Sequence, residues 1–140
     1  MIDYSKLEKS LKHLELQLEN YRVAQDRPEL TELDREAIGE SVIQRFETTY
    51  DTLWKNLKRY LIDELGLAEV PNSPKPILKL GGENNLFASP VAQWLKYADA
   101  RTDTAHDYDG EKAAATLAIV GEFMDDAIGL FQTITGKSWS

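Results

Sequence analysis

Apolar residues recur at steps of three and four over long segments of this chain, and this periodicity limits the possible folds. The pattern covers residues 4–21, becomes dense from 42 to 65, and returns after residue 109 as far as 134. Such steps place side chains along one face of an α-helix. No segment alternates apolar and polar residues for long enough to compete as a β-strand. The sequence therefore predicts an all-α fold.

Proline, glycine and N-cap residues predict where the first two helices begin and end. A polar stretch ending in proline, residues 25–28, should end the first helix because proline lacks an amide donor. Thr31 followed by Asp34 is an N-cap signature, which predicts a second, long helix over 32–65. Gly66 then supplies a left-handed C-cap. The two longest apolar stripes thus belong to two separate helices.

The second half of the chain predicts two more helices behind a connector. Residues 70–82 hold three of the five prolines, which favours a connector with at most a short helical piece. Ser89 and Pro90 are typical of an N-cap and a first-turn proline. The last helix should begin near Asp109 and end at Gly136. The expected fold is an up-and-down four-helix bundle with an additional short helical segment.

Composition narrows the functional classes. A chain of 140 residues with 42% hydrophobic residues suits one domain, which we expect to span residues 1–140. The absence of cysteine excludes disulfides, thiolate nucleophiles and cysteine-ligated zinc, and two histidines cannot form a histidine-rich metal site. We therefore expect no metal ion and no cofactor.

Charge and hydropathy bear on location and partners. The formal net charge is −8, which argues against the broad basic surface that DNA binding requires, so contact with any nucleic acid should be local. No apolar run approaches the roughly 20 residues that span a membrane, and the N-terminus lacks a signal peptide pattern. These features predict a soluble, cytoplasmic protein with no membrane association.

The stretch RTDTAHDY, residues 101–108, contains one of the two histidines and lies between two predicted helices. Histidine titrates near neutrality, arginine stays charged and fits a pair of phosphate oxygens, and a tyrosine hydroxyl can orient a ligand or accept a transferred group. Arg101, His106 and Tyr108 therefore outline a phosphodiester or nucleotide site. The alternative is that the histidine only caps or packs a helix end.

Helix geometry constrains how these residues could act together. In an unbroken helix His106 would lie roughly 140° around the axis from Arg101. For both to act on one group, the helix must end or distort between Thr102 and Asp107. The Thr and Asp residues in this interval can bond to nearby backbone and so permit such a turn.

Two segments resemble a known family. RTDTAHDY fits the pattern Arg, four residues, His, one residue, Tyr of the HEPN superfamily of nucleotide-binding helical domains. IQRFETTYDTLWKNLKRYL, residues 43–61, resembles a segment of the nucleotidyltransferase substrate-binding branch of that superfamily. The helix order and chain length also agree, so the resemblance covers most of the chain. Ala100 and Thr102 are the positions where the motif departs from the residues usual in the family.

The resemblance implies a helical protein that forms a homodimer and a complex with a minimal nucleotidyltransferase in a toxin–antitoxin-type module. It further implies a metal-independent endoribonuclease in which Arg101 stabilises the scissile phosphate and His106 acts as general acid or base. The site would be completed across the dimer. Tyr108 would match the tyrosine that the partner enzyme modifies with AMP.

Three functional hypotheses stay open on the sequence. The chain is a ribonuclease that uses Arg101 and His106, or a non-catalytic subunit that binds a nucleotide or other substrate for the nucleotidyltransferase. The third is an inert helical dimer in which the Arg and His only tie two helices together. The aromatic residues on the helix stripes are expected in the core or at a dimer interface, and not at a surface that stacks on bases. These residues are Phe46, Tyr50, Trp54 and Trp94. Trp139 should fold back onto the bundle.

Overall fold

The computed structural model of the chain describes residues 1–106 and 110–140, and the chain forms five helices and no strand within them. The all-α prediction is confirmed. The helices are α1 (Ser5–Ala24), α2 (Glu32–Asp63), α3 (Pro74–Glu83), α4 (Val91–His106) and α5 (Gly110–Thr135).

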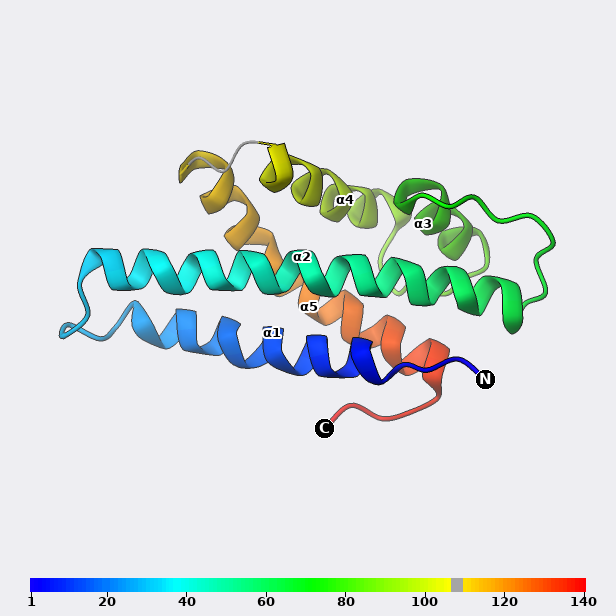
Figure 1. Cartoon of the computed structure of the whole chain (residues 1–140), viewed down its shortest axis with the longest axis horizontal. Helices are drawn as coiled ribbons and strands as arrows, with labels where there is room; N and C mark the ends of the chain where they lie inside the picture. The colour runs from blue at the N-terminus through cyan, green and yellow to red at the C-terminus, as the bar shows by residue number, and fades with distance from the viewer. Residues whose placement is uncertain (107–109) are drawn as a thin grey trace.

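The long helix α2 is the centre of the fold. It contacts each of the other four helices, with α1 beside it and α5 crossing it diagonally (Figure 1). Helices α3 and α4 lie along the opposite side of α2 from α1 (Figure 1). Helices α1, α2, α4 and α5 form the predicted bundle, and α3 is the additional short helix.

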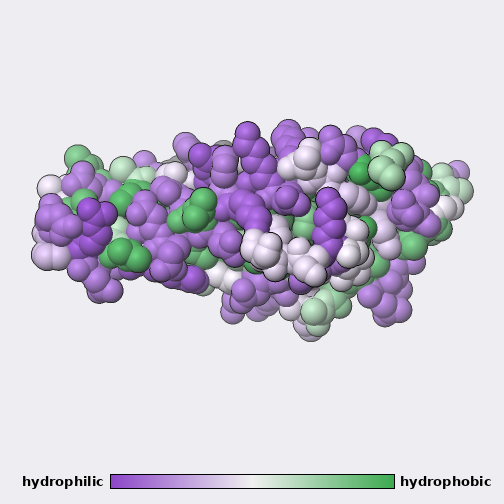
Figure 2. Space-filling view, turned by 90° about the horizontal axis from the view of Figure 1, so that it is seen from below, coloured by the Kyte–Doolittle hydropathy of each residue, from purple (hydrophilic) through white to green (hydrophobic). Residues whose placement is uncertain are grey.

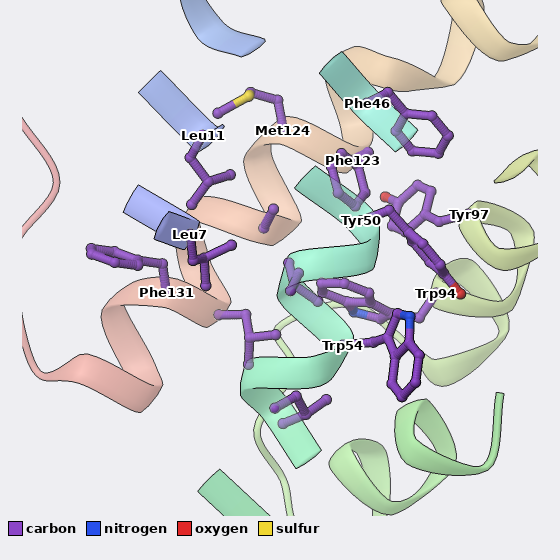
Figure 3. Close-up of a cluster of buried hydrophobic side chains, with 14 of the residues drawn as sticks. Leu7, Leu11, Phe46, Tyr50, Trp54, Trp94, Tyr97, Phe123, Met124 and Phe131 are labelled. Atoms are coloured by element: carbon purple, nitrogen blue, oxygen red, sulfur yellow. The ribbon is translucent and has the colours of Figure 1, made fainter. Parts of the chain in front are cut away.

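The core is rich in aromatic side chains from three helices (Figure 3). Phe123 of α5 makes edge-to-face contacts with Phe46 of α2 and with Tyr97 of α4, and Trp94 contacts Tyr97 in the same way. Edge-to-face pairs add about 0.5–1.5 kcal/mol each to the stabilisation from burial. The predicted core positions Phe46, Tyr50 and Trp94 are at most 1% exposed, which fixes α4 firmly against α2 and α5.

The start of α2 is locally encoded as predicted. The Thr31 hydroxyl accepts a hydrogen bond from the Asp34 amide at 3.0 Å, and the Asp34 carboxylate accepts one from the Thr31 amide at 2.9 Å. This reciprocal capping box satisfies two backbone donors that the first turn leaves unpaired. At the other end the helix stops at Asp63, and Gly66 has the left-handed φ of 70° expected after a helix.

Helix α3 is longer than the short piece expected in the connector. Pro74 and Pro76 both fall in its first turn, where a missing amide costs nothing. Gly81 and Gly82 lie inside the helix instead of ending it. A Cβ at Gly81 would come within 2.6 Å of the Phe87 ring, so glycine here serves close packing. An adjacent pair of glycines is typical of a break in a helix. Here the helix continues through both, and the packing of Gly81 against Phe87 explains why glycine is present.

The start of α4 differs from the prediction by one residue. The helix begins at Val91, and Pro90 precedes its first turn. Because α4 begins at Val91, the predicted N-cap residue Ser89 lies one residue before the cap position. Its hydroxyl donates a hydrogen bond to the Asp126 carboxylate of α5 at 2.6 Å.

The C-terminal segment folds back as expected. Trp139 packs edge-to-face on Phe131, and its indole N–H donates to Glu15 of α1 at 3.2 Å. The surface in Figure 2 is largely hydrophilic, with separate hydrophobic patches. In the part of the chain that the structure describes, no helix is both long and apolar enough to span a membrane.

Candidate functional site

Arg101 of α4 lies against two carboxylates of α2. Its Nε and Nη2 atoms donate to the two Asp51 oxygens at 3.2 and 3.1 Å, and Nη1 donates to Glu47 at 3.0 Å. The paired contact to Asp51 is the two-pronged geometry for which guanidinium is suited. The arginine side chain is 27% exposed, so the cluster is shielded but still open to solvent.

The two carboxylates favour the protonated form of Arg101. The hydrogen bonds to Asp51 raise the guanidinium pKa, burial opposes the rise, and the charges of Asp51 and Glu47 add to it. The arginine therefore stays protonated at neutral pH.

Thr104 holds one of the two carboxylates in place. Its hydroxyl is buried and lies 2.9 Å from the same Glu47 oxygen that Arg101 contacts. Glu47 and Asp51 are four residues apart on α2, so they share one face of that helix. This arrangement orients the guanidinium and links α4 to α2.

Helix α4 remains helical through His106, near the far end of the interval in which it would have to end or distort for Arg101 and His106 to act on one group. The backbone between Arg101 and His106 therefore keeps helical geometry, and the two positions lie roughly 140° apart around the axis. They do not share a face within one chain. The side chain of His106 and the whole of Tyr108 lie outside the described residues.

A cavity of about 520 Å³ opens beside the arginine. Its walls come from α2, from the first turn of α3 and from α4. The residues lining it are Tyr50, Asp51, Ser73, Pro74, Lys75, Pro76, Ala98, Arg101 and Thr102. Volumes of roughly 300–1,000 Å³ are typical of small-molecule sites. Arg101 thus reaches both the carboxylates and a space large enough for a ligand.

A second cavity and the other histidine lie away from Arg101. A cavity of about 690 Å³ between α1, α2 and α5 shares no lining residue with the one beside Arg101. The second histidine, His13, was expected on the surface; it is partly exposed on α1, with Nδ1 3.2 Å from Nη1 of Arg45. Among the described residues no three His, Asp or Glu side chains are grouped as metal ligands.

Sequence reasoning missed the partners of Arg101. Glu47 and Asp51 both lie in the family-like segment 43–61, but neither was assigned a role from the sequence. Glu47 and Asp51 are four residues apart on the helix, but Glu32, Glu36 and Glu40 have the same spacing, so the sequence does not single out the pair. Tyr50 was assigned correctly to the core, but its place in a cavity wall requires the position of α3.

Comparison with known proteins agrees with this fold. A probable ribonuclease, HepT, from Haemophilus influenzae is 28% identical over 102 residues, which cover 69% of this chain and 66% of that protein. A Haemophilus influenzae structure described as the fold of a substrate binding domain of a nucleotidyltransferase superposes with a TM-score of 0.82. It is 23% identical and covers 94% of this chain and 98% of the other.

A second solved structure, from Thermus thermophilus, superposes with a TM-score of 0.67 at 24% identity and covers 87% of this chain and 98% of its own. These structural likenesses concern the fold. The model of the family described as nucleotidyltransferase substrate binding protein like matches residues 2–135. The chain belongs to this family of nucleotidyltransferase substrate-binding-like helical proteins.

Proposed function

We propose that this protein is the helical partner of a minimal nucleotidyltransferase and acts as a metal-independent endoribonuclease in a toxin–antitoxin-type module. Membership of the substrate-binding-like family supports the partner. The similarity to a probable ribonuclease over 69% of the chain supports the activity. A cytoplasmic location follows from this role, because cellular RNA is the substrate.

The observation that carries the proposal is the state of Arg101. A guanidinium has five N–H donors, and the contacts to Glu47 and Asp51 use three of them. Two donors are left for phosphate oxygens at a side chain that is 27% exposed and lines a cavity. The arginine can therefore stabilise the charge that develops on a scissile phosphate.

His106 supplies the proton transfer in this mechanism. The 2′-oxygen of RNA loses its proton to a base and bonds to phosphorus, while the 5′-oxygen leaves and takes up a proton. A histidine that titrates near neutrality can perform either transfer. The substrate itself provides the nucleophile, so RNA and not DNA is cleaved.

The helical path of α4 supports a site shared by two copies of the chain. The positions of Arg101 and His106 lie on different sides of one helix. In a homodimer, Arg101 of one copy can meet His106 of the other. Tyr108, two residues after the histidine, is the position at which the nucleotidyltransferase would attach AMP. A bulky nucleotide beside the histidine would block the site, which is the antitoxin step.

RNA cleavage in excess chelator tests this function. Purified protein should cleave mixed cellular RNA, and His106→Ala should abolish cleavage while helix content stays unchanged. His13→Ala is the matched control, because it removes the other histidine of the chain. This variant should cleave RNA like the protein without substitutions. Equal cleavage by the His106→Ala variant would refute the role of this residue.

The same cluster supports one alternative function, a non-catalytic subunit that binds a nucleotide or another substrate for the nucleotidyltransferase. The specific observation is that two carboxylates contact the guanidinium, which lowers its effective charge toward a reacting phosphate. No cleavage by protein shown by mass spectrometry to be unmodified at Tyr108, together with nucleotide binding that Arg101→Ala weakens, would favour this function.

A further inference from the structure

The cavity beside Arg101 has a buried polar atom in its wall that lacks a partner. Tyr50 is 1% exposed and lines the cavity, and its hydroxyl makes no hydrogen bond. Buried hydroxyl groups nearly always have a partner, because an unsatisfied one costs about 1–3 kcal/mol. A ligand in the cavity would remove this cost.

Charged groups of α2 and α4 act on the Tyr50 hydroxyl. Burial raises the pKa of Tyr50, Asp51 and Asp99 raise it further, and Arg101 lowers it. Asp99 and Arg101 both belong to α4, so the phenol oxygen lies within the electrostatic reach of that helix. Tyr50 of α2 and Arg101 of α4 both line this cavity.

Cationic and hydroxyl groups surround the rest of the cavity. Lys75 of α3 forms an ion pair with Asp99 at 2.7 Å, and its side chain is 52% exposed. Ser73 and Thr102 bring hydroxyl groups. Ser73 does not cap α3 with its side chain, and Lys75 is the one residue among the first three of α3 that carries an amide N–H. Each of these groups can contact a phosphate oxygen or a sugar hydroxyl.

Apolar and charge properties restrict the ligand further. Pro74, Pro76 and Ala98 give the cavity smooth apolar walls, against which a flat ring can pack. The groups nearby include two cations and three carboxylates. This balance disfavours a ligand with several negative charges, and it suits a phosphodiester, which carries one.

We propose that this cavity is the binding subsite for one nucleotide unit of the RNA substrate, with its phosphate at Arg101 and Lys75 and an acceptor atom at the Tyr50 hydroxyl. The proposal rests on the proposed function, since it places RNA at the same arginine. It assigns Tyr50 as a binding residue in a subsite whose local charge discriminates phosphodiesters from nucleoside triphosphates.

Tyr50→Phe tests the subsite because it removes the hydroxyl and nothing else. The hydroxyl has no partner in the free protein, so unfolding in urea should show equal or higher stability. Tyr4→Phe is the matched control, because the Tyr4 hydroxyl is also buried without a partner but lies outside the cavity lining. Calorimetry would measure binding of a 2′-O-methyl tetranucleotide, which lacks the nucleophile needed for cleavage.

We expect Tyr50→Phe to weaken binding of the tetranucleotide about tenfold, as the loss of one well-made hydrogen bond predicts. Tyr4→Phe should bind the tetranucleotide like the protein without substitutions. ATP should compete with the tetranucleotide less effectively than AMP does. Unchanged affinity in Tyr50→Phe, or equal losses in both variants, would overturn the subsite. An ATP affinity above that of AMP would overturn the assigned preference.

The outcomes separate this proposal from the ribonuclease function. If the protein without substitutions cleaves RNA and Tyr50→Phe has the same KM, the proposed subsite is refuted and the ribonuclease function stands. If the tetranucleotide binds in a way that depends on Tyr50 but the protein cleaves no RNA, the proposed subsite stands and the ribonuclease function is refuted.

Discussion

Among single residues, Arg101 is expected to affect both stability and function. Arg101→Ala would leave Glu47 and Asp51 facing each other without their cation in a half-buried position. Because repulsion and lost hydrogen bonds act together, we expect the free energy of unfolding to fall by about 1–2 kcal/mol. The midpoint of urea unfolding, followed by circular dichroism, measures this change.

Arg59→Ala provides the comparison for Arg101. Arg59 pairs with Asp63 four residues later on α2, and its side chain is 60% exposed. Exposed pairs of this type contribute about 0.3–0.5 kcal/mol. Equal effects of the two substitutions would show that the Arg101 cluster adds nothing beyond an ordinary surface pair.

Arg101→Lys separates charge from geometry. Lysine keeps the cation but cannot make the two-pronged contact with Asp51. We expect RNA cleavage to fall at least about tenfold, with a smaller loss of stability than for Arg101→Ala, because the carboxylates stay neutralised. Full activity of the lysine variant would mean that a point charge suffices at this position.

Among the helices, α3 forms one wall of the cavity beside Arg101, and its packing depends on Gly81. Gly81→Ala would place a methyl group 2.6 Å from the Phe87 ring, which stacks on Trp94. We expect a loss of about 1–3 kcal/mol from this overpacking. Gly129→Ala in α5 is the control, because its Cβ meets no atom within 4 Å.

Alanine at Gly129 should raise stability by about 0.5–1 kcal/mol through its better helix propensity. Thermal unfolding of the two variants should therefore shift in opposite directions. Shifts in the same direction would contradict the packing described for α3.

The helix ends that depend on neighbouring residues were predictable, and those that depend on distant contacts were not. Thr31 and Asp34 are three residues apart, so their capping box could be seen in the sequence. Gly81 lies inside a helix, where the Phe87 ring leaves no room for a side chain, and the hydroxyl of Ser89 donates to Asp126, 37 residues away. Local propensity carries no information on such partners.

At the scale of the whole molecule, the raised pKa values of three tyrosines predict how stability changes at alkaline pH. Burial raises the pKa of Tyr4 to about 12, and it also raises the pKa values of Tyr50 and Tyr97 from their usual 10.0. Below about pH 10 these groups are neutral in both the folded and the unfolded chain, so their contribution is fully present. Above it the unfolded chain loses protons first, which favours unfolding.

The free energy of unfolding should therefore decrease as the pH rises from about 10 toward 12. Tyr50→Phe should make this decrease shallower, since it removes one of the late-titrating groups. Urea unfolding at a series of pH values measures both slopes, and identical slopes for the two proteins would contradict the shifted pKa of Tyr50.

The candidate site was only partly predictable for the same reason as the helix ends. Arg101, His106 and Tyr108 belong to one short motif and could be found together. The partners of Arg101 lie 50 and 54 residues earlier in the chain, and only the packing of α4 on α2 brings them to the guanidinium. The helical backbone through His106 also could not be predicted from a stretch rich in Thr and Asp.

One mixing experiment tests most directly whether Arg101 and His106 form a ribonuclease site between two copies of the chain. Arg101→Ala and His106→Ala should each be inactive alone. After the two variants are unfolded together and refolded, about half of the dimers are mixed and each mixed dimer holds one intact site, so about a quarter of the original activity should return. No recovery from a mixture shown to contain mixed dimers would contradict a shared site.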